Sequence, residues 1–234
     1  MNQGWFVTGT DTGIGKTVAA AALLLQLRDQ GRHAIYMKPV QTGCDVEGAT
    51  CVAPDLRHCH RLVGLPPVSD EEEDCCPYRL RMPASPHLAA AREGVTIDME
   101  HIIAAHRRLQ ERYEHVVVEG AGGVLVPLND SLTNLDLMQQ LDLPVVVVCR
   151  PGLGTLNHTL LTLQILRKAG LNTAGLVTVD TTDAPWTDIE EDNQATLQRM
   201  GRLPLLGRIT YHPALADESA GPDILRTCIQ GLSV

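Results

Sequence analysis

Short apolar runs alternate with longer amphipathic stretches along this chain, and the alternation predicts its secondary structure. The apolar runs have the length and β-branched content of buried strands, and they cover residues 4–8, 34–38, 115–119, 145–149 and 174–179. Helical patterns lie between them, at residues 16–28, 99–113, 135–141, 157–169 and 189–200. Strands that are apolar on both faces belong inside a parallel sheet. The chain is therefore predicted to be a single α/β domain over residues 1–234, with a mostly parallel sheet flanked by helices.

Two stretches interrupt this rhythm, at residues 44–56 and 66–86. The second contains several prolines and an unbroken acidic run from Asp70 to Asp74. Both stretches are predicted to be surface loops or lids, and the acidic run is more typical of a solvated face than of a cation site. Right-handed βαβ crossovers place the loops that follow the strands over a common crevice. We therefore expect ligand chemistry at the carboxyl ends of the strands.

Composition and charge narrow the possible partners. The formal net charge is -9 and no long run of Lys and Arg occurs, which argues against nucleic acid as a partner. The longest apolar run, residues 18–25, is far too short to span a membrane, so no membrane partner is expected and a cytoplasmic location is predicted. The seven cysteines contain no C-x-x-C pair, and reduced thiols are expected. One group has zinc-binding side chains but matches no common zinc spacing, namely Cys51, His58, Cys59 and His60.

The strongest chemical signal is Gly-Thr-Asp-Thr-Gly-Ile-Gly-Lys-Thr at residues 9–17. It is a longer variant of the phosphate-binding loop, because its first glycine lies one residue earlier than in the strict pattern. Backbone N–H groups and the following helix start can cradle phosphates, Lys16 can neutralise the β and γ phosphates, and Thr17 can bind Mg²⁺. A plain glycine-rich turn is the alternative, although strand, loop and helix occur here in the order that a nucleotide site needs. The predicted nucleotide-binding residues of the loop are Asp11, Thr12, Gly13, Ile14, Gly15, Lys16, Thr17 and Val18.

Two further strands end in residues suited to the same crevice. Lys38 ends the strand at residues 34–38, and the Pro and Gly that follow it predict a tight turn. Glu119 ends the strand at residues 115–119 and precedes a glycine-rich segment, residues 120–123. A carboxylate at that place can hold Mg²⁺, and the glycines allow a ligand to approach closely.

These motifs occur in an order that resembles the dethiobiotin synthetase family, over nearly the whole chain. The resemblance rests on Thr8-Gly9-Thr10-Asp11-Thr12 with Gly15-Lys16-Thr17, Lys38-Pro39-Val40, Ser85-Pro86-His87, Val118-Glu119-Gly120-Ala121-Gly122-Gly123, Leu153-Gly154 with Asn157-His158, and Pro204-Leu205-Leu206-Gly207.

The resemblance implies a ligation that needs Mg²⁺ and ATP. In that family, diaminopelargonic acid takes up carbon dioxide on one amine, ATP phosphorylates the carbamate, and the other amine closes the ring. Lys16 and Lys38 would be the catalytic cations, because fixed positive charge suits phosphoryl transfer. Thr17, Asp55 and Glu119 would coordinate Mg²⁺, with Asp55 resting on its spacing from Lys38 alone.

The resemblance also implies where the substrates bind. The predicted substrate-binding residues are Thr12, Lys38, Thr42, Gly120, Ala121, Gly122, Gly154 and Asn157, and the predicted residues at the nucleotide base are Asp180, Pro204 and Leu206. A homodimer is expected, in which Gly154 and Asn157 begin a helix that binds the carboxylate of the partner's substrate. A simple helix cap is the alternative interpretation of that turn.

Two positions depart from the family pattern, and other interpretations stay open. Gly13 stands where well-known members carry an acid, and Val179 stands where an asparagine often recognises adenine, so another triphosphate could be accepted. A cobyrinic acid amide synthase-like ligase would need a glutaminase domain, for which 234 residues leave no room. A ParA- or MinD-like ATPase switch typically has a further lysine early in this loop, where the present chain has Asp11, Thr12 and Gly13.

Overall fold

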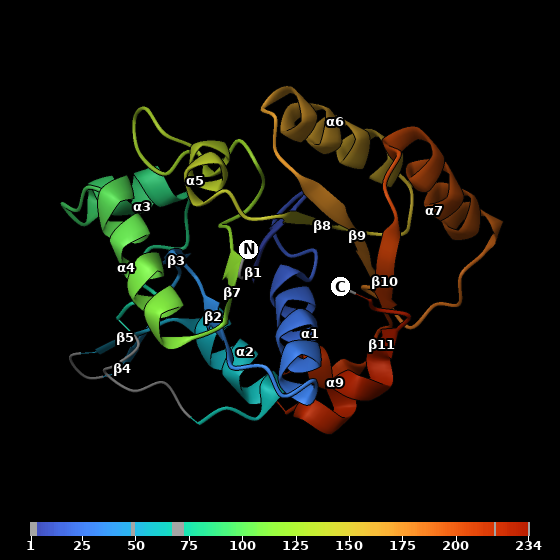
Figure 1. The fold of residues 1–234 in the computed structure, drawn as a ribbon, viewed down its shortest axis with the longest axis horizontal. Coiled ribbons are helices and arrows are strands. Elements are labelled where there is room, and N and C mark those ends of the chain that lie inside the picture. The colour runs from blue at the N-terminus through green and yellow to red at the C-terminus, as the bar shows by residue number, and fades with distance from the viewer. Residues whose placement is uncertain (1–3, 48–49, 67–72, 218, 234) are drawn as a thin grey trace.

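The computed structural model describes residues 4–47, 50–66, 73–217 and 219–233, and a twisted sheet lies at its centre (Figure 1). Within the described residues this sheet has seven strands, in the order β2, β7, β1, β8, β9, β10, β11. Their bounds are β1 (Gly4–Gly9), β2 (Ala34–Met37), β7 (His115–Glu119), β8 (Val145–Cys149), β9 (Thr173–Val179), β10 (Leu205–Ile209) and β11 (Ile229–Gln230). Neighbouring strands are parallel except for β10 and β11, which are antiparallel. The predicted α/β class with a mostly parallel sheet is confirmed.

Helices cover both faces of the sheet (Figure 1). The layer on one face consists of α1 (Lys16–Asp29), α2 (Pro54–Val63) and α9 (Pro222–Cys228), which contact one another. The layer on the other face consists of α4 (Met99–Arg112), α5 (Asn134–Leu141), α6 (Thr155–Lys168) and α7 (Asp188–Gly201). Two short helices, α3 (Pro86–Arg92) and α8 (Pro213–Ala216), lie outside these layers. The strands in the middle are therefore buried on both faces, as their apolar sequences require.

The core is almost entirely aliphatic. Val145, Val146, Val147 and Val148 of β8 are all fully buried. The Ala and Leu residues of α1 are buried nearly all round, because this helix lies between the sheet and the pair α2 and α9. No helix in the described residues is long and apolar enough to cross a membrane.

Strands and helices were predicted well where they are long and poorly where they are short. The five predicted strands are confirmed as β1, β2, β7, β8 and β9, and the five predicted helices as α1, α4, α5, α6 and α7. The prediction missed β10, because Gly207 and Arg208 interrupt its short apolar run. Gly207 is required there, since a Cβ would lie 2.7 Å from the Cα of Leu232.

The prediction that residues 44–56 and 66–86 are loops was partly wrong. The first stretch forms a hairpin of β4 (Asp45–Glu47) and β5 (Thr50–Val52) and then enters α2. The second contains β6 (Tyr78–Leu80), which pairs in parallel with β3 (Val40–Thr42). Strands of three residues are too short for periodicity to reveal them.

The predicted acidic face is only partly described. Residues 70–72 of the acidic run lie outside the described residues. Asp74, at the end of the run, forms ion pairs with Arg108 at 2.7 Å and Arg112 at 2.8 Å on α4. This carboxylate therefore ties the segment before β6 to α4.

Candidate nucleotide and catalytic site

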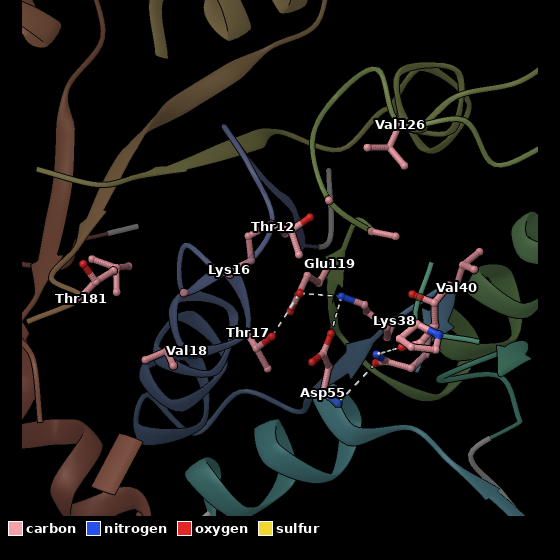
Figure 2. Close-up of a pocket in the computed structure, with 18 of the residues that line it drawn as sticks. Thr12, Lys16, Thr17, Val18, Lys38, Val40, Asp55, Glu119, Val126 and Thr181 are labelled. Atoms are coloured by element: carbon pink, nitrogen blue, oxygen red, sulfur yellow. Dashed lines mark hydrogen bonds and ion pairs between the residues drawn. The ribbon is translucent and has the colours of Figure 1, made fainter. Parts of the chain in front are cut away.

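A cavity of about 890 Å³ lies at the carboxyl ends of β1, β2, β7 and β9, where the crossover rule places ligand sites. Figure 2 shows its central side chains directed toward one another from α1, α2, β7 and the segment after β2. The structure brings most of the predicted site residues to its wall, namely Thr12, Gly13, Gly15, Lys16, Thr17, Val18, Lys38, Thr42, Asp55, Glu119, Ala121, Gly122 and Asp180.

The predicted phosphate-binding loop connects β1 to α1 at the centre of this cavity. Gly15 ends the loop with φ +90°, and an added Cβ would lie 2.6 Å from Cγ1 of Val179, so both conformation and space demand glycine. The start of α1 has no side-chain cap, which leaves its first N–H groups available to an anion. The Lys16 ammonium donates to the carbonyl of Asp11 at 2.7 Å across the loop. Burial lowers the pKa of Lys16 to about 8.

Gly13 is conformationally required although its surroundings are open. Its φ is +68°, in the left-handed region, and an added Cβ would meet nothing within 4 Å. Crowding therefore does not explain the glycine at this departure from the family pattern. Val179, the other departure, packs against Gly15 and is one of the residues that line the cavity.

Buried opposite charges meet beside this loop (Figure 2). The Lys38 ammonium lies 2.6 Å from Oδ2 of Asp55 and 2.6 Å from Oε1 of Glu119, and the Thr17 hydroxyl donates to the same Oε1 at 3.1 Å. Burial favours a neutral lysine, but the Glu119 and Asp55 carboxylates outweigh it and raise the pKa of Lys38 above its ordinary value. Burial likewise opposes ionisation of Asp55, yet the charge of Lys38 lowers its pKa. Lys38 and Asp55 are therefore charged together.

Tyr36 completes this cluster and was not predicted. Its hydroxyl donates to Oε2 of Glu119 at 2.7 Å, and the side chain is fully buried. Burial, followed by the Glu119 charge, raises the pKa of Tyr36 well above its ordinary value, so the phenol remains a donor. No local sequence pattern points to Tyr36, because its contact with Glu119 arises only when β2 lies beside β7.

The oxygen donors in this cluster suit magnesium. Thr17, Asp55 and Glu119 offer hydroxyl and carboxylate oxygens, and the two carboxylates already share one cation, the Lys38 ammonium. Within the described ranges, no group of three or more His, Cys, Asp or Glu side chains is placed to hold a metal ion by itself. Mg²⁺ commonly takes one or two carboxylates and completes its shell with phosphate oxygens and water.

Asn134 fixes the shape of the glycine-rich segment after β7 and was also missed from sequence. Its side-chain amide donates to the carbonyls of Ala121 at 2.5 Å and Gly123 at 3.0 Å. Gly122 in this segment has φ +68°, and an added Cβ would lie 3.4 Å from Oγ1 of Thr12. The segment therefore approaches the phosphate-binding loop closely, and a buried amide holds it there.

Some predicted residues lie away from the cavity wall. Ile14 is buried in the core, and Asp11 contributes the carbonyl that Lys16 binds. Gly154 and Asn157 are exposed at the start of α6. Gly120 lies behind the wall, its backbone N–H bonded to the carbonyl of Val7.

Pro204 and Leu206 lie at the start of β10, at the end of the strand remote from the cavity. The register pairs Leu205 with Leu176, whereas Ile209 pairs with Val179 at the cavity end. The cavity is lined instead by residues after β10 that the sequence did not reveal, namely Tyr211, His212 and Leu215. Other lining residues that were not assigned a role are Gln41, Val40, Pro83, Ala84, Ser85, Pro86, Val126 and Thr181.

Asp180 lines the cavity with its carboxylate already engaged. Oδ1 accepts a hydrogen bond from Nε1 of Trp186 at 3.0 Å, and Oδ2 accepts one from Nε of Arg208 at 2.9 Å. The Arg208 guanidinium lies over the Trp186 ring, 3.7 Å from its centroid. This cluster ties the segment after β9 to β10 at one end of the cavity.

Comparison with known proteins places the chain among ligases. The sequence model of a family described as an AAA domain matches residues 3–219. The ATP-dependent dethiobiotin synthetase BioD of Anaeromyxobacter dehalogenans strain 2CP-1 is 42% identical, over 96% of this chain and 93% of that protein. The proteins of the same name from Anoxybacillus flavithermus and Bacillus subtilis are 39% and 36% identical, covering 89% and 88% of this chain and 92% and 86% of theirs.

Solved structures with a similar fold come from a different functional group. The MinC:MinD cell division complex of Aquifex aeolicus aligns with a TM-score of 0.61 at 13% identity, over 96% of this chain and 89% of that one. A ParA family ATPase from Chlorobium tepidum aligns with a TM-score of 0.57 at 12% identity, over 99% and 91% of the two chains. At such low identity this likeness shows a shared P-loop fold alone.

Proposed function

Because this chain belongs to the family of ATP-dependent dethiobiotin synthetases, ligases of biotin synthesis, we propose that it closes the ureido ring of dethiobiotin from 7,8-diaminopelargonic acid, carbon dioxide and ATP. One amine adds to carbon dioxide and loses a proton, giving a carbamate. A carbamate oxygen attacks the γ-phosphorus and ADP leaves. The second amine then attacks the carbonyl carbon of this mixed anhydride, and inorganic phosphate leaves as the ring closes.

The observation that carries the proposal is the meeting of two buried lysines in one cavity. Lys16 lies at the phosphate-binding loop, and Lys38 lies beside it on the segment after β2. Phosphoryl transfer needs fixed positive charge at the γ-phosphate and the attacking oxygen, and it needs no covalent nucleophile from the protein. Lys16 would hold the β and γ phosphates, and Lys38 would stabilise the carbamate and the transferring group.

Thr17, Asp55 and Glu119 would hold Mg²⁺ next to the phosphates. The ion would supply positive charge that offsets the negative charge developing on the phosphates during transfer. Before it binds, the two carboxylates keep Lys38 charged and directed into the cavity.

The diamine would lie along the wall formed by Thr12, Thr42, Ala121 and Gly122, with Gly120 directly behind this wall. Thr12 and Gly122 approach each other there, which places a hydroxyl beside backbone groups held by Asn134. The nucleotide base would lie at the end of the cavity that Asp180 lines, and the earlier assignment of Pro204 and Leu206 to this base stays a prediction.

We also propose a homodimer in which α6 meets its copy. Leu153 is 87% exposed and Leu161 is 58% exposed, an unusual exposure for leucines on one helix and its entry turn. Gly154 caps α6 without a side-chain hydrogen bond, so the first N–H groups of the helix can bind a carboxylate. In the dimer, Gly154 and Asn157 would reach the far carboxylate of the partner's substrate. The whole chain would act as one ligase domain in the cytoplasm.

The experiment that tests the function is phosphate release from Mg-ATP by purified protein with the diamine and bicarbonate, omitting each component in turn. Mass spectrometry of the product accompanies it. We expect release to require both the diamine and bicarbonate, with equal amounts of dethiobiotin formed. Repeating the assay with CTP and GTP determines the base preference. Release that is indifferent to the diamine would refute the ligase and favour a P-loop ATPase switch.

A further inference from the structure

Glu119 is buried at the end of β7 and must have partners on both carboxylate oxygens. It is 1% exposed, and an ionised carboxylate in such a place is stable only when it is paired and hydrogen-bonded. Oε1 accepts from Thr17 at 3.1 Å and Lys38 at 2.6 Å. Among the described residues, the donor to Oε2 is Tyr36, at 2.7 Å.

The sheet itself places Tyr36 at this oxygen. Tyr36 on β2 is the register partner of Val117 on β7. Side chains two residues apart along a strand point to the same face, so Tyr36 shares a face of the sheet with Val117 and Glu119. The phenol therefore lies on the buried side of the carboxylate, and the cavity lies on the other.

We propose that Tyr36 is a positioning residue that holds the Glu119 carboxylate with Oε1 turned toward the cation site. Tyr36 does not line the cavity, so it acts through Glu119 and does not touch the substrates. A hydrogen bond from a buried hydroxyl to a carboxylate is short and strong, and it fixes the rotation of the carboxylate plane. Partners of this kind behind a metal ligand commonly change metal affinity by roughly 10- to 100-fold.

The inference rests on the proposed function, in which Glu119 is a ligand of Mg²⁺. Its test measures the binding of ADP and Mg²⁺ and does not require the ligase reaction to occur. Calorimetric titration of the full chain with ADP in EDTA gives the metal-free affinity, and added MgCl₂ then gives the half-saturating Mg²⁺ concentration. In Tyr36→Phe we expect the metal-free ADP affinity to stay within about twofold and the half-saturating Mg²⁺ concentration to rise roughly tenfold or more. In turnover, saturating Mg²⁺ should restore most of kcat.

Tyr113→Phe is the matched control. It also removes one phenol hydroxyl, from a ring that stacks on His33 at the opposite end of β7. We expect its Mg²⁺ requirement to equal that of the unchanged protein. A merely structural role of Tyr36 would lower the melting temperature and weaken ADP binding with and without metal alike, and that outcome would overturn the inference.

A double-variant comparison tests whether Tyr36 acts through Glu119, and Glu119→Gln on its own tests the metal assignment even if Tyr36→Phe folds poorly. Glu119→Gln alone should raise the half-saturating Mg²⁺ concentration. The double variant Glu119→Gln/Tyr36→Phe should need no more Mg²⁺ than Glu119→Gln does. Equal effects of Tyr36→Phe with and without Glu119→Gln would rule out action through Glu119. An unchanged Mg²⁺ requirement in Glu119→Gln would instead refute the metal assignment of the proposed function, and the inference with it.

Discussion

At the scale of the residue, Lys16 and Lys38 are both buried, yet their pKa values move in opposite directions. Burial dominates at Lys16 and lowers its pKa to about 8, whereas two carboxylates raise the pKa of Lys38. A lysine held by two anions resists loss of its proton but also competes with any other cation for those anions. The charge on Lys38 and the proposed binding of Mg²⁺ would therefore be coupled.

The Lys38→Met variant separates the two expected effects of this lysine, namely its charge at the transferring phosphoryl group and its competition with Mg²⁺ for the carboxylates. We expect turnover to fall by at least about a hundredfold, because the transferring phosphoryl group loses a fixed charge. The Mg²⁺ concentration that half-saturates ADP binding should fall, since the competing ammonium is gone. Lys168→Met, at the exposed end of α6, is the control and should change neither quantity. Wild-type turnover in Lys38→Met would remove this lysine from the mechanism.

The buried side chain of His106 is expected to make the free energy of unfolding depend on pH. It lies on the buried face of α4, its Nε2 has no hydrogen-bond partner among the described residues, and burial lowers its pKa to about 4. In the unfolded chain the pKa of this histidine is about 6.5. Below that pH the unfolded state binds a proton that the folded state does not bind until the pH is much lower. This group therefore destabilises the fold as pH falls from about 6.5 to about 4, by roughly 3 kcal/mol at most.

Chemical denaturation of His106→Leu between pH 7 and pH 4 measures this contribution. We expect the free energy of unfolding to fall less steeply with acid in the variant than in the unchanged protein. His101→Leu removes an exposed histidine from the same helix and should keep the original slope. Identical slopes in His106→Leu and the unchanged protein would show that His106 does not carry this linkage.

At the scale of the element, the segment between β7 and α5 depends on one buried amide. Asn134 is 1% exposed at the first turn of α5, and its two hydrogen bonds set the path of residues 121–123. Backbone that lines a ligand site needs a donor inside the protein to keep its carbonyls turned inward. The position of α5 and the shape of the substrate wall are therefore linked through this residue.

Asn134→Leu should affect both stability and catalysis. Two buried carbonyls lose their donor, so the free energy of unfolding should fall by about 2–3 kcal/mol. Displacement of the wall should also lower kcat/KM for the diamine by roughly tenfold or more. Gln26→Leu removes an amide bonded to the carbonyl of Leu232, far from the cavity, and should cost stability without changing kinetics. Wild-type kcat/KM in Asn134→Leu would contradict a role for this amide in the site.

Elements were predictable in proportion to their length. The phosphate-binding loop and α1 follow from contiguous residues, and so does the β7 strand that ends in Glu119. The three-residue strands β3 to β6 and the glycine-interrupted β10 depend on partners that come from elsewhere in the chain. Periodicity over a few residues cannot distinguish such strands from loop.

At the scale of the whole molecule, α6 and its entry turn present leucines that nothing in the described chain covers. Leu153 is 87% exposed and Leu161 is 58% exposed. Burial of such side chains against a second copy would be favourable by roughly 25 cal/mol per Å² of apolar surface. The proposed dimer therefore has a driving force that can be removed without disturbing the core.

The double variant Leu153→Glu/Leu161→Glu tests this arrangement. We expect sedimentation analysis to show a monomer with an unchanged melting transition, because neither side chain supports the core. KM for the diamine should rise, since Gly154 and Asn157 would no longer reach the partner's substrate. Val46→Glu, on the exposed β4–β5 hairpin, is the control and should remain a dimer. A double variant that sediments like the unchanged protein would refute an interface through α6.

The sequence by itself determined the fold class, the phosphate-binding loop and the family, because each of these depends on contiguous residues or on a repeating local pattern. Only the tertiary structure decided which distant residues share the cavity. Lys38, Asp55 and Glu119 meet because β2 lies beside β7 and α2 packs against α1, and strand order is set by packing of the whole core. For the same reason, Tyr36 and Asn134 became visible only in three dimensions, since burial and hydrogen-bond partners are properties of the folded chain.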